Sequence, residues 1–186
     1  CAQVGHESLG LFYMEELASG SAYEGRKDLG NTQPGDGKWF KGRGPIQLTG
    51  RANYAKFGAW CKGRGLVDAA DYFTRNPGEV ATSRWGFLAA SWYWTVERPK
   101  LNSYADAGDV FSASCEVNGW IKLKTGGWRT PNGYDDRKAR WNACLRLGSA
   151  LLPSQEDDMP TVPEFWAQPI DDPYTPQGGD SMPAFA

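Results

Sequence analysis

The sequence is poor in the residues that build metal sites. It has a single histidine, His6, among 186 residues, and its four cysteines form no Cys-x-x-Cys pair. Zinc sites use His and Cys ligands at short spacings, so a zinc knuckle is disfavoured and no metal or organic cofactor is implied. We expect the cysteines, Cys1, Cys61, Cys115 and Cys144, to be reduced and packed.

The sequence also lacks long apolar runs and a charge surplus. No run approaches the ~20 apolar residues of a membrane span, and no basic start with an apolar stretch marks a secretory signal. The net charge of −2 does not fit a nucleic-acid binder and gives no long-range attraction to an anionic cell wall. We expect a monomer with neither membrane nor nucleic acid as a partner. Because residues 1–4 read like the middle of a helix, we expect the chain to be cut from a longer one.

Helical periodicity dominates residues 1–152 and predicts a mainly α fold. Asn76-Pro77 marks a turn, with Pro77 suited to the first turn of the next helix. The polar stretch 19–44 predicts a long functional loop, with at most a small β-hairpin near 38–46. The expected helices are 1–9, 51–64, 79–96, 107–117 and 135–152.

The composition changes near Leu152. Residues 153–186 hold seven prolines and the acidic cluster Glu156-Asp157-Asp158, a composition that buries little surface. We expect a catalytic domain over 1–152 and a Pro-rich acidic linker or tail over 153–186, draped over the domain through Phe165 and Trp166. A linker at this place suggests a further module downstream.

Acidic residues near the start of the chain suggest hydrolytic chemistry. His6-Glu7-Ser8 is followed by Glu15-Glu16, and glycoside hydrolysis needs two carboxyl groups that flank the scissile bond. On one continuous helix, nine positions rise about 13 Å and turn about half a circle, so Glu7 and Glu16 would face opposite ways. The pair therefore requires a break, which Gly10 permits; otherwise Glu15 and Glu16 are solvated surface charges.

Several motifs together resemble family 19 glycoside hydrolases over roughly residues 1–150. The motifs are His6-Glu7-Ser8-Leu9-Gly10, Tyr23-Glu24-Gly25-Arg26, the runs 29–37 and 42–54, Asn76-Pro77, Val117-Asn118-Gly119 and Asp136-Arg137. The run 29–37 and the ending Gly50-Arg51-Ala52-Asn53-Tyr54 look more like phage lysins, including those of mycobacterial and other actinobacterial phages, than like plant chitinases.

The resemblance implies a role for each matched residue. Glu7 matches the general acid and Glu16 the general base, and Thr49 matches a residue that holds the attacking water. Arg137 matches an arginine that supports the carboxylates. The matched substrate-binding positions are Gln47, Asn53 and Asn118.

Departures from the family pattern leave alternatives open. Lys122 stands where plant-type members carry Glu, so the charge network around Arg137 must differ. Glu15 or Glu24 could be the base in place of Glu16. The aromatic residues Tyr23, Trp39 and Phe40 are candidates for sugar stacking, and core packing is the other reading of each.

The resemblance implies a two-lobed, lysozyme-like domain with the substrate cleft between the lobes. It implies an inverting endolysin that cuts peptidoglycan between MurNAc and GlcNAc, with a chitinase or a non-catalytic wall-binding module as alternatives. An endolysin of this kind would stay in the host cytoplasm until a holin opens the membrane, and then reach the cell wall. Further endolysin modules would be expected in the parent chain.

Overall fold

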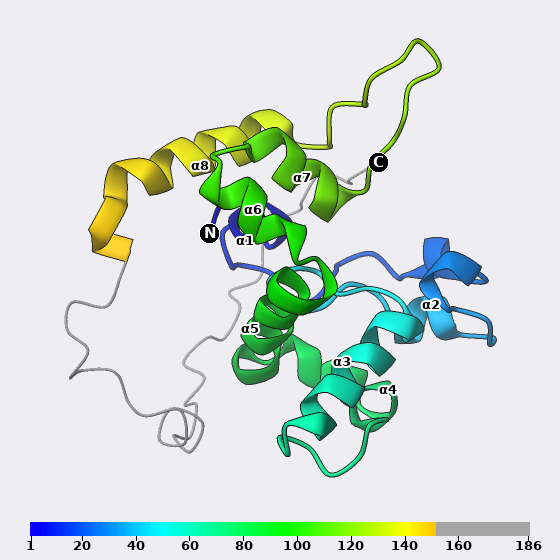
Figure 1. Cartoon of the computed structure of the whole chain (residues 1–186). Coiled ribbons are helices and arrows are strands. Elements are labelled where there is room, and N and C mark those ends of the chain that lie inside the picture. Colours follow the sequence, from blue (N-terminus) through cyan, green and yellow to red (C-terminus); the bar gives the residue numbers. More distant parts are fainter. Residues whose placement is uncertain (152–186) are drawn as a thin grey trace, which may run out of the picture. The chain divides into compact units, whose positions relative to one another are not determined.

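The computed structural model describes residues 1–151, and this part of the chain is mainly helical (Figure 1). The α-helices are α1 (Ala2–Glu7), α2 (Asp36–Trp39), α3 (Arg51–Gly63), α4 (Tyr72–Arg75), α5 (Ser83–Trp92), α6 (Lys100–Asp106), α7 (Val110–Asn118) and α8 (Tyr134–Leu147). Short turns add η1 (Ser21–Tyr23), η2 (Lys27–Leu29), η3 (Pro77–Ala81), the π-turn η4 (Tyr93–Glu97) and η5 (Gly148–Leu151). The predicted linker 153–186, with Phe165 and Trp166, lies outside the described residues.

The helices of this part pack in two groups. In one group, α1 and α7 pack on α8, and α6 packs on α7; in the other, α3 packs on α4, and α5 on η3 (Figure 1). The turn η4 continues α5 and contacts α6, so it joins the groups. None of the helices described is long and apolar enough to span a membrane. All four cysteines are free thiols, of which Cys61 and Cys115 are buried.

The main core lies under α3 and α5. Tyr54, Phe57 and Cys61 recur at helical spacing on α3 and are fully buried. Phe57 stacks on Phe73 at 4.6 Å between ring centroids and meets Trp92 at 5.5 Å. Each such side chain contributes about 1.5–3 kcal/mol through burial, so these aromatic residues hold this group together.

Three consecutive residues with left-handed backbone conformations follow α1. The backbone φ angles are +52° at Leu9, +74° at Gly10 and +70° at Leu11, all in the left-handed region. The hydroxyl of Ser8 accepts a hydrogen bond from the Leu11 amide at 2.8 Å and donates one to the Val4 carbonyl. The helix thus ends at Glu7, before the predicted break, and the chain reverses toward Glu16.

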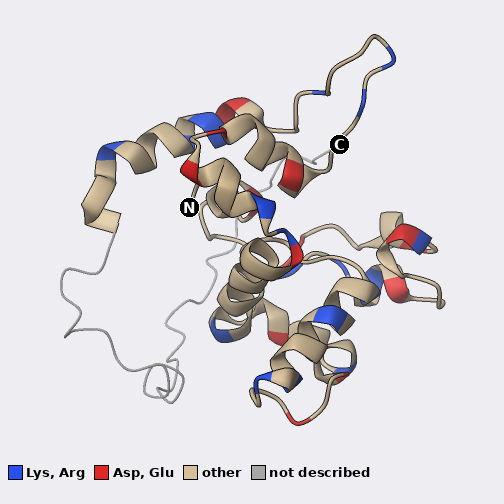
Figure 2. Ribbon diagram, viewed as in Figure 1, with Lys and Arg blue, Asp and Glu red and all other residues tan. Residues whose placement is uncertain are grey.

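The predicted small hairpin lies elsewhere in the sequence. Residues 38–46 form part of α2 and an irregular segment, in which Arg43 makes isolated bridges to Glu15 and Leu48. The hairpin lies at 120–130, where the Arg129 amide donates to the Ile121 carbonyl at 2.8 Å. Gly126 and Gly127 both have positive φ at its tip. It projects from the helices and carries only basic charges (Figure 2).

The predicted helix 79–96 is divided into three pieces. Pro77 opens the short turn η3, as predicted for this proline, and Thr82 then caps α5 by accepting from the Trp85 amide. Pro99 ends the π-turn η4 but also precedes α6, a helix that the periodicity did not reveal. A proline at the start of a helix lacks an amide that would be unpaired there in any case.

Candidate active site

The carboxylate of Glu7 is held by a buried arginine. The Nη2 group of Arg137 donates to Glu7 Oε1 at 2.5 Å, and the Arg137 side chain is 1% exposed. The other two guanidinium nitrogens donate to Gln3 Oε1 and to the Asn132 carbonyl. Within residues 1–151 no group donates to Glu7 Oε2, so this oxygen can carry a transferable proton.

His6 precedes Glu7 in the sequence, but its side chain contacts Asp136. Its Nδ1 lies 2.7 Å from Asp136 Oδ2, which also accepts from Arg140 Nε at 2.8 Å. Burial raises the pKa of Asp136, but the hydrogen bonds from Arg140 and His6 outweigh it and leave that pKa below its usual value. His6 is therefore a structural residue that holds Asp136.

Glu16 is held in a different way, by two neutral donors. The Tyr23 hydroxyl donates to Oε1 at 3.0 Å and the Gly42 amide donates to Oε2 at 3.0 Å. The Glu16 amide in turn donates to the Gly42 carbonyl at 2.9 Å. These contacts fix both oxygens of Glu16 beside Gly42.

Tyr23 lies in the electric field of both carboxylates. Burial, followed by the charge and hydrogen bond of Glu16, raises the pKa of Tyr23 to about 12, and the charge of Glu7 adds to this effect. The phenol therefore stays protonated at all ordinary pH values and keeps donating to Glu16. Asn31, itself fully buried, fixes the loop by donating to the Tyr23 carbonyl at 2.9 Å.

The two alternative bases are engaged elsewhere. Glu15 pairs with Lys41 at 3.1 Å and with Arg43 at 3.2 Å. Both oxygens of Glu24 accept backbone amides, from Gly35 at 2.7 Å and Gly37 at 2.8 Å. These contacts give Glu15 and Glu24 structural roles, and the geometry favours Glu16 as the base.

Gln47 and Thr49 converge with Glu16 on Gly42. A Cβ atom added to Gly42 would lie 2.7 Å from Gln47 Oε1, 3.2 Å from Glu16 Oε2 and 3.4 Å from Thr49 Oγ1. Position 42 therefore leaves no room for a side chain. The Thr49 hydroxyl donates to the Gln47 carbonyl at 2.9 Å, which leaves its oxygen able to accept a hydrogen bond from a water beside Glu16.

The remaining matched residues have backbone partners. Asn53 Nδ2 donates to the Thr49 carbonyl at 2.8 Å and so fixes the segment that carries Thr49. Asn118 Oδ1 accepts the Asn132 amide at 3.0 Å, and Asn132 also binds Arg137. Lys122 lies on the hairpin opposite Trp128. Within the described part, Gln3 and Asn132 complete the contacts of Arg137.

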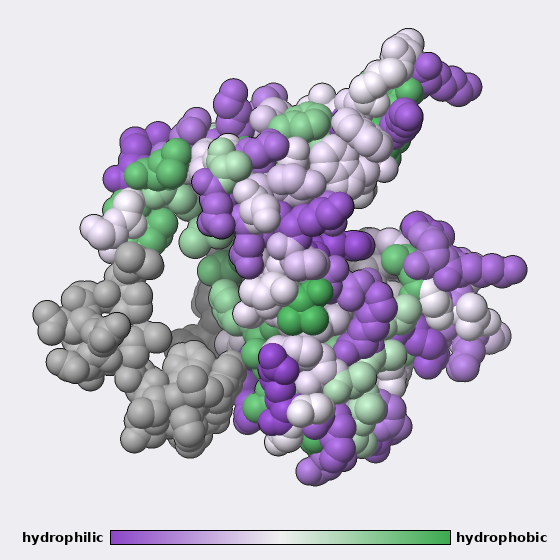
Figure 3. All heavy atoms as spheres, viewed as in Figure 1, coloured by the Kyte–Doolittle hydropathy of each residue, from purple (hydrophilic) through white to green (hydrophobic). Residues whose placement is uncertain are grey.

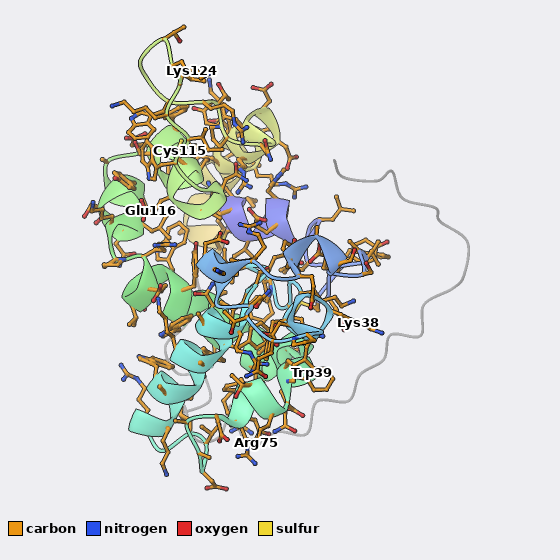
Figure 4. All side chains as sticks on the ribbon, turned by 90° about the vertical axis from the view of Figure 1, so that its right-hand side faces the viewer. Lys38, Trp39, Arg75, Cys115, Glu116 and Lys124 are labelled. Carbon is orange, nitrogen blue, oxygen red and sulfur yellow. The ribbon has the colours of Figure 1, made fainter. Side chains whose placement is uncertain are left out.

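Of the aromatic candidates, one belongs to the core and two to the surface region. Phe40 is fully buried, with the Arg51 guanidinium 4.6 Å above its ring, so its proposed contact with sugar is wrong. Trp39 is 53% exposed and lies on the face toward the viewer in Figure 4. Tyr23 is half-buried beside Glu16. Of these three candidates, Trp39 and Tyr23 can therefore contact a ligand.

The two carboxylates have separate supports. Glu7 is fixed from α8, whereas Glu16 is fixed from the loop around Gly42, so their supports come from different parts of the fold. The space-filling outline is hollowed between the hairpin and the segment around α2 (Figure 3).

No group of three or more His, Cys, Asp or Glu side chains that could hold a metal occurs among the residues described.

Relatives are found among known glycoside hydrolases. A glycosyl hydrolase family 19 domain-containing protein of Haemophilus influenzae is 30% identical over 131 residues, covering 70% of this chain and 53% of that protein. An endochitinase of Arabidopsis thaliana is 37% identical over 102 residues, covering 54% of this chain and 32% of its own length. The chain is a homologue of family 19 glycoside hydrolases.

The fold agrees with this homology. A crystal structure of a chitinase C mutant superposes with a TM-score of 0.55 and 23% identity, covering 78% of this chain and 68% of that one. The family 19 resemblance and the mainly helical, chitinase- and lysozyme-like fold are thus confirmed. No protein-family model matches the chain. The chain spans about half the length of the Haemophilus protein and about a third of the Arabidopsis endochitinase.

Two supports of the site were not predicted from the sequence. Gln3 links Arg137 to Ser114, and the Gly42 amide binds Glu16, yet neither residue type signals such a role. Gly42 lies within the matched run 42–54, which gave its only signal. Gln3 lies in the apparently ordinary first helix, and only the fold brings it to Arg137, 134 positions away.

Proposed function

We propose that this chain hydrolyses β-1,4 bonds between MurNAc and GlcNAc in bacterial peptidoglycan by an inverting mechanism. The observation that carries the proposal is the pair of carboxylates, one held by Arg137 with Oε2 open and the other held by Tyr23 and Gly42. Glu7 would protonate the leaving oxygen, and Glu16 would activate a water held by Thr49.

Charge favours peptidoglycan over chitin as the substrate. All 20 Lys and Arg residues lie in 1–151, whereas seven of the 22 acidic residues lie in 152–186. Residues 1–151 therefore carry a formal charge of +5, which the net charge of the whole chain conceals. Peptidoglycan bears carboxylates on its peptides and chitin is neutral, so this surplus supports the anionic polymer.

A chitinase is the second candidate. Endochitinases of Arabidopsis thaliana and Beta vulgaris are among the relatives, at 37% and 34% identity. The same pair of carboxylates would serve either polymer. The purified chain should be incubated with peptidoglycan and with colloidal chitin, and the products identified by mass spectrometry. MurNAc reducing ends support our proposal, and chito-oligosaccharides alone would favour the chitinase.

Two variants test the roles of the carboxylates. Glu7→Gln keeps an acceptor for Arg137 but removes the transferable proton, and Glu16→Gln removes the base. General acid or base catalysis contributes about 100- to 10,000-fold, so we expect losses of that size with nearly unchanged melting temperatures. Glu79→Gln is the matched control, because its carboxylate has no hydrogen bond or ion pair among the described contacts. Undiminished turnover by Glu7→Gln would refute the assignment.

We also propose that the parent protein is a phage endolysin that stays in the host cytoplasm until a holin opens the membrane. The lysin-like runs 29–37 and 50–54 support this origin. Expression in the bacterial cytoplasm should leave cells intact until the membrane is permeabilised, after which turbidity should fall. Lysis that the Glu7→Gln variant also produces would show that the turbidity change has another cause.

A further inference from the structure

The hairpin at 120–130 is an exposed arm with a fixed base. Residues 121–130 are all exposed, and the two sides pair through Lys122 and Trp128. At the base, Trp120 Nε1 donates to Glu116 Oε2 at 2.8 Å, and its ring meets Trp128 at 4.9 Å between centroids. The arm is thus held at one end, while Lys124 lies near its free tip (Figure 4).

The arm grows out of the residues that support the catalytic acid. Its first side follows Asn118, and its second side leads to Asn132. The Asn132 amide binds Asn118 Oδ1 at 3.0 Å, and the Asn132 carbonyl accepts Arg137 Nε at 3.0 Å. Arg137 in turn binds Glu7. The base of this arm is therefore linked to Glu7 through Asn132 and Arg137.

The side chains of the arm suit an anionic ligand with apolar faces. Residues 119–133 contain Lys122, Lys124 and Arg129 but no acidic residue. Among the described contacts, none of these three cations has an ion pair. Trp128 is 47% exposed, and Ile121 and Leu123 are 41% and 42% exposed. Unpaired cations beside an open indole ring can bind carboxylates and sugar rings together.

We propose that this arm recognises the peptide-bearing glycan strands of peptidoglycan, with Lys122 and Lys124 pairing with carboxylates of the stem peptides. The inference rests on the proposed function, because it assigns the arm to the same substrate. Exposed ion pairs each contribute about 1.4- to 5-fold in affinity, so two lysines supply about 2- to 30-fold. A neutral glycan offers them no partner, and the arm therefore discriminates between polymers.

The test compares native peptidoglycan with the same material after its peptide carboxyl groups have been converted to neutral amides by a carbodiimide and ammonia. The double variant Lys122→Gln/Lys124→Gln should lower the ratio of kcat/KM on native over amidated strands by about 2- to 30-fold. The control Lys62→Gln/Arg146→Gln removes two exposed charges from α3 and α8 and should leave this ratio unchanged. An unchanged ratio in the hairpin variant, or an equal change in the control, overturns the proposal.

Binding separates this proposal from the proposed function. In the Glu7→Gln background, co-sedimentation with intact sacculi at low salt should weaken by a similar factor when the two hairpin lysines are replaced, and the difference should vanish at high salt. If the wild-type chain cleaves neither polymer, the proposed activity fails, and co-sedimentation still decides whether the arm binds. If the Glu7→Gln chain binds equally well with and without the two hairpin lysines, the proposed role of the arm is overturned.

Discussion

Three acidic residues that are close in the sequence have different surroundings. Glu15 pairs with two cations, Glu24 accepts two backbone amides, and Glu16 accepts a phenol and an amide beside Thr49. The sequence left the choice of base open because hydrogen-bond partners come from loops with no periodic pattern. The geometry favours Glu16, and kinetic tests decide its role.

Tyr23→Phe tests the support of Glu16. The variant removes the donor to Oε1 and keeps the ring, so we expect kcat to fall about 10- to 100-fold with little change in stability. Because the pKa of Tyr23 is about 12, the wild-type rate should show no titration of this phenol below that range. Tyr134→Phe, which changes a half-buried ring on α8, is the control. Equal rates for both variants would remove Tyr23 from the catalytic arrangement.

At the scale of elements, helix positions were largely predictable and their junctions were not. Residues 51–64 were predicted as a helix, and α3 covers Arg51–Gly63, because its apolar residues recur along one face. The hairpin was misplaced because its exposed side chains leave no alternation of buried and exposed positions. Similarly, α6 begins directly after Pro99, between the predicted helices 79–96 and 107–117, where we predicted no helix.

The junction of α1, α7 and α8 depends on Gln3. Its Nε2 donates to Ser114 Oγ at 2.9 Å, and its Oε1 accepts Arg137 Nη1. Gln3→Ala leaves a buried guanidinium nitrogen unpaired, so we expect a loss of about 2–4 kcal/mol in the free energy of unfolding and a lower kcat. Urea denaturation measures this, with the exposed Asn142→Ala as a control. A loss no larger than that of the control would show that water replaces Gln3.

The junction of α2 and α3 should respond to acid. Asp36, 2% exposed, pairs with Arg51, and this hydrogen bond holds the pKa of Asp36 below its usual value of 3.8. The ionised carboxylate therefore stabilises the fold above that value, and this contribution is lost as the pH falls through the lower folded-state value.

Asp36→Asn should therefore cost about 2–3 kcal/mol at neutral pH, less than a fully buried pair because Arg51 is 31% exposed. Melting curves of both proteins should converge as the pH falls through and below the lowered pKa of Asp36. If the difference in melting temperature between the two proteins stays constant with pH, Asp36→Asn destabilises the fold through lost packing and not through lost charge.

At the scale of the whole molecule, charge is divided along the chain. Residues 1–151 carry a formal charge of +5 and residues 152–186 carry −7. The expectation of no attraction to an anionic wall therefore applies to the net charge of the whole chain and not to residues 1–151. Removing 152–186 should increase binding to anionic sacculi about tenfold at low salt. The gain should disappear near 1 M salt, where the screening length is about 3 Å. A full-length chain with its seven acidic residues replaced by amides should behave like the shortened one.

The contact between Glu7 and Arg137 joins residues 130 positions apart. During synthesis the two carboxylates leave the ribosome early, whereas the arginine that positions the acid follows only when almost all of residues 1–151 have been made. An incomplete chain would carry Glu7 and Glu16 without this support. Glu7 therefore gains its contact with Arg137 only once α8 has been made.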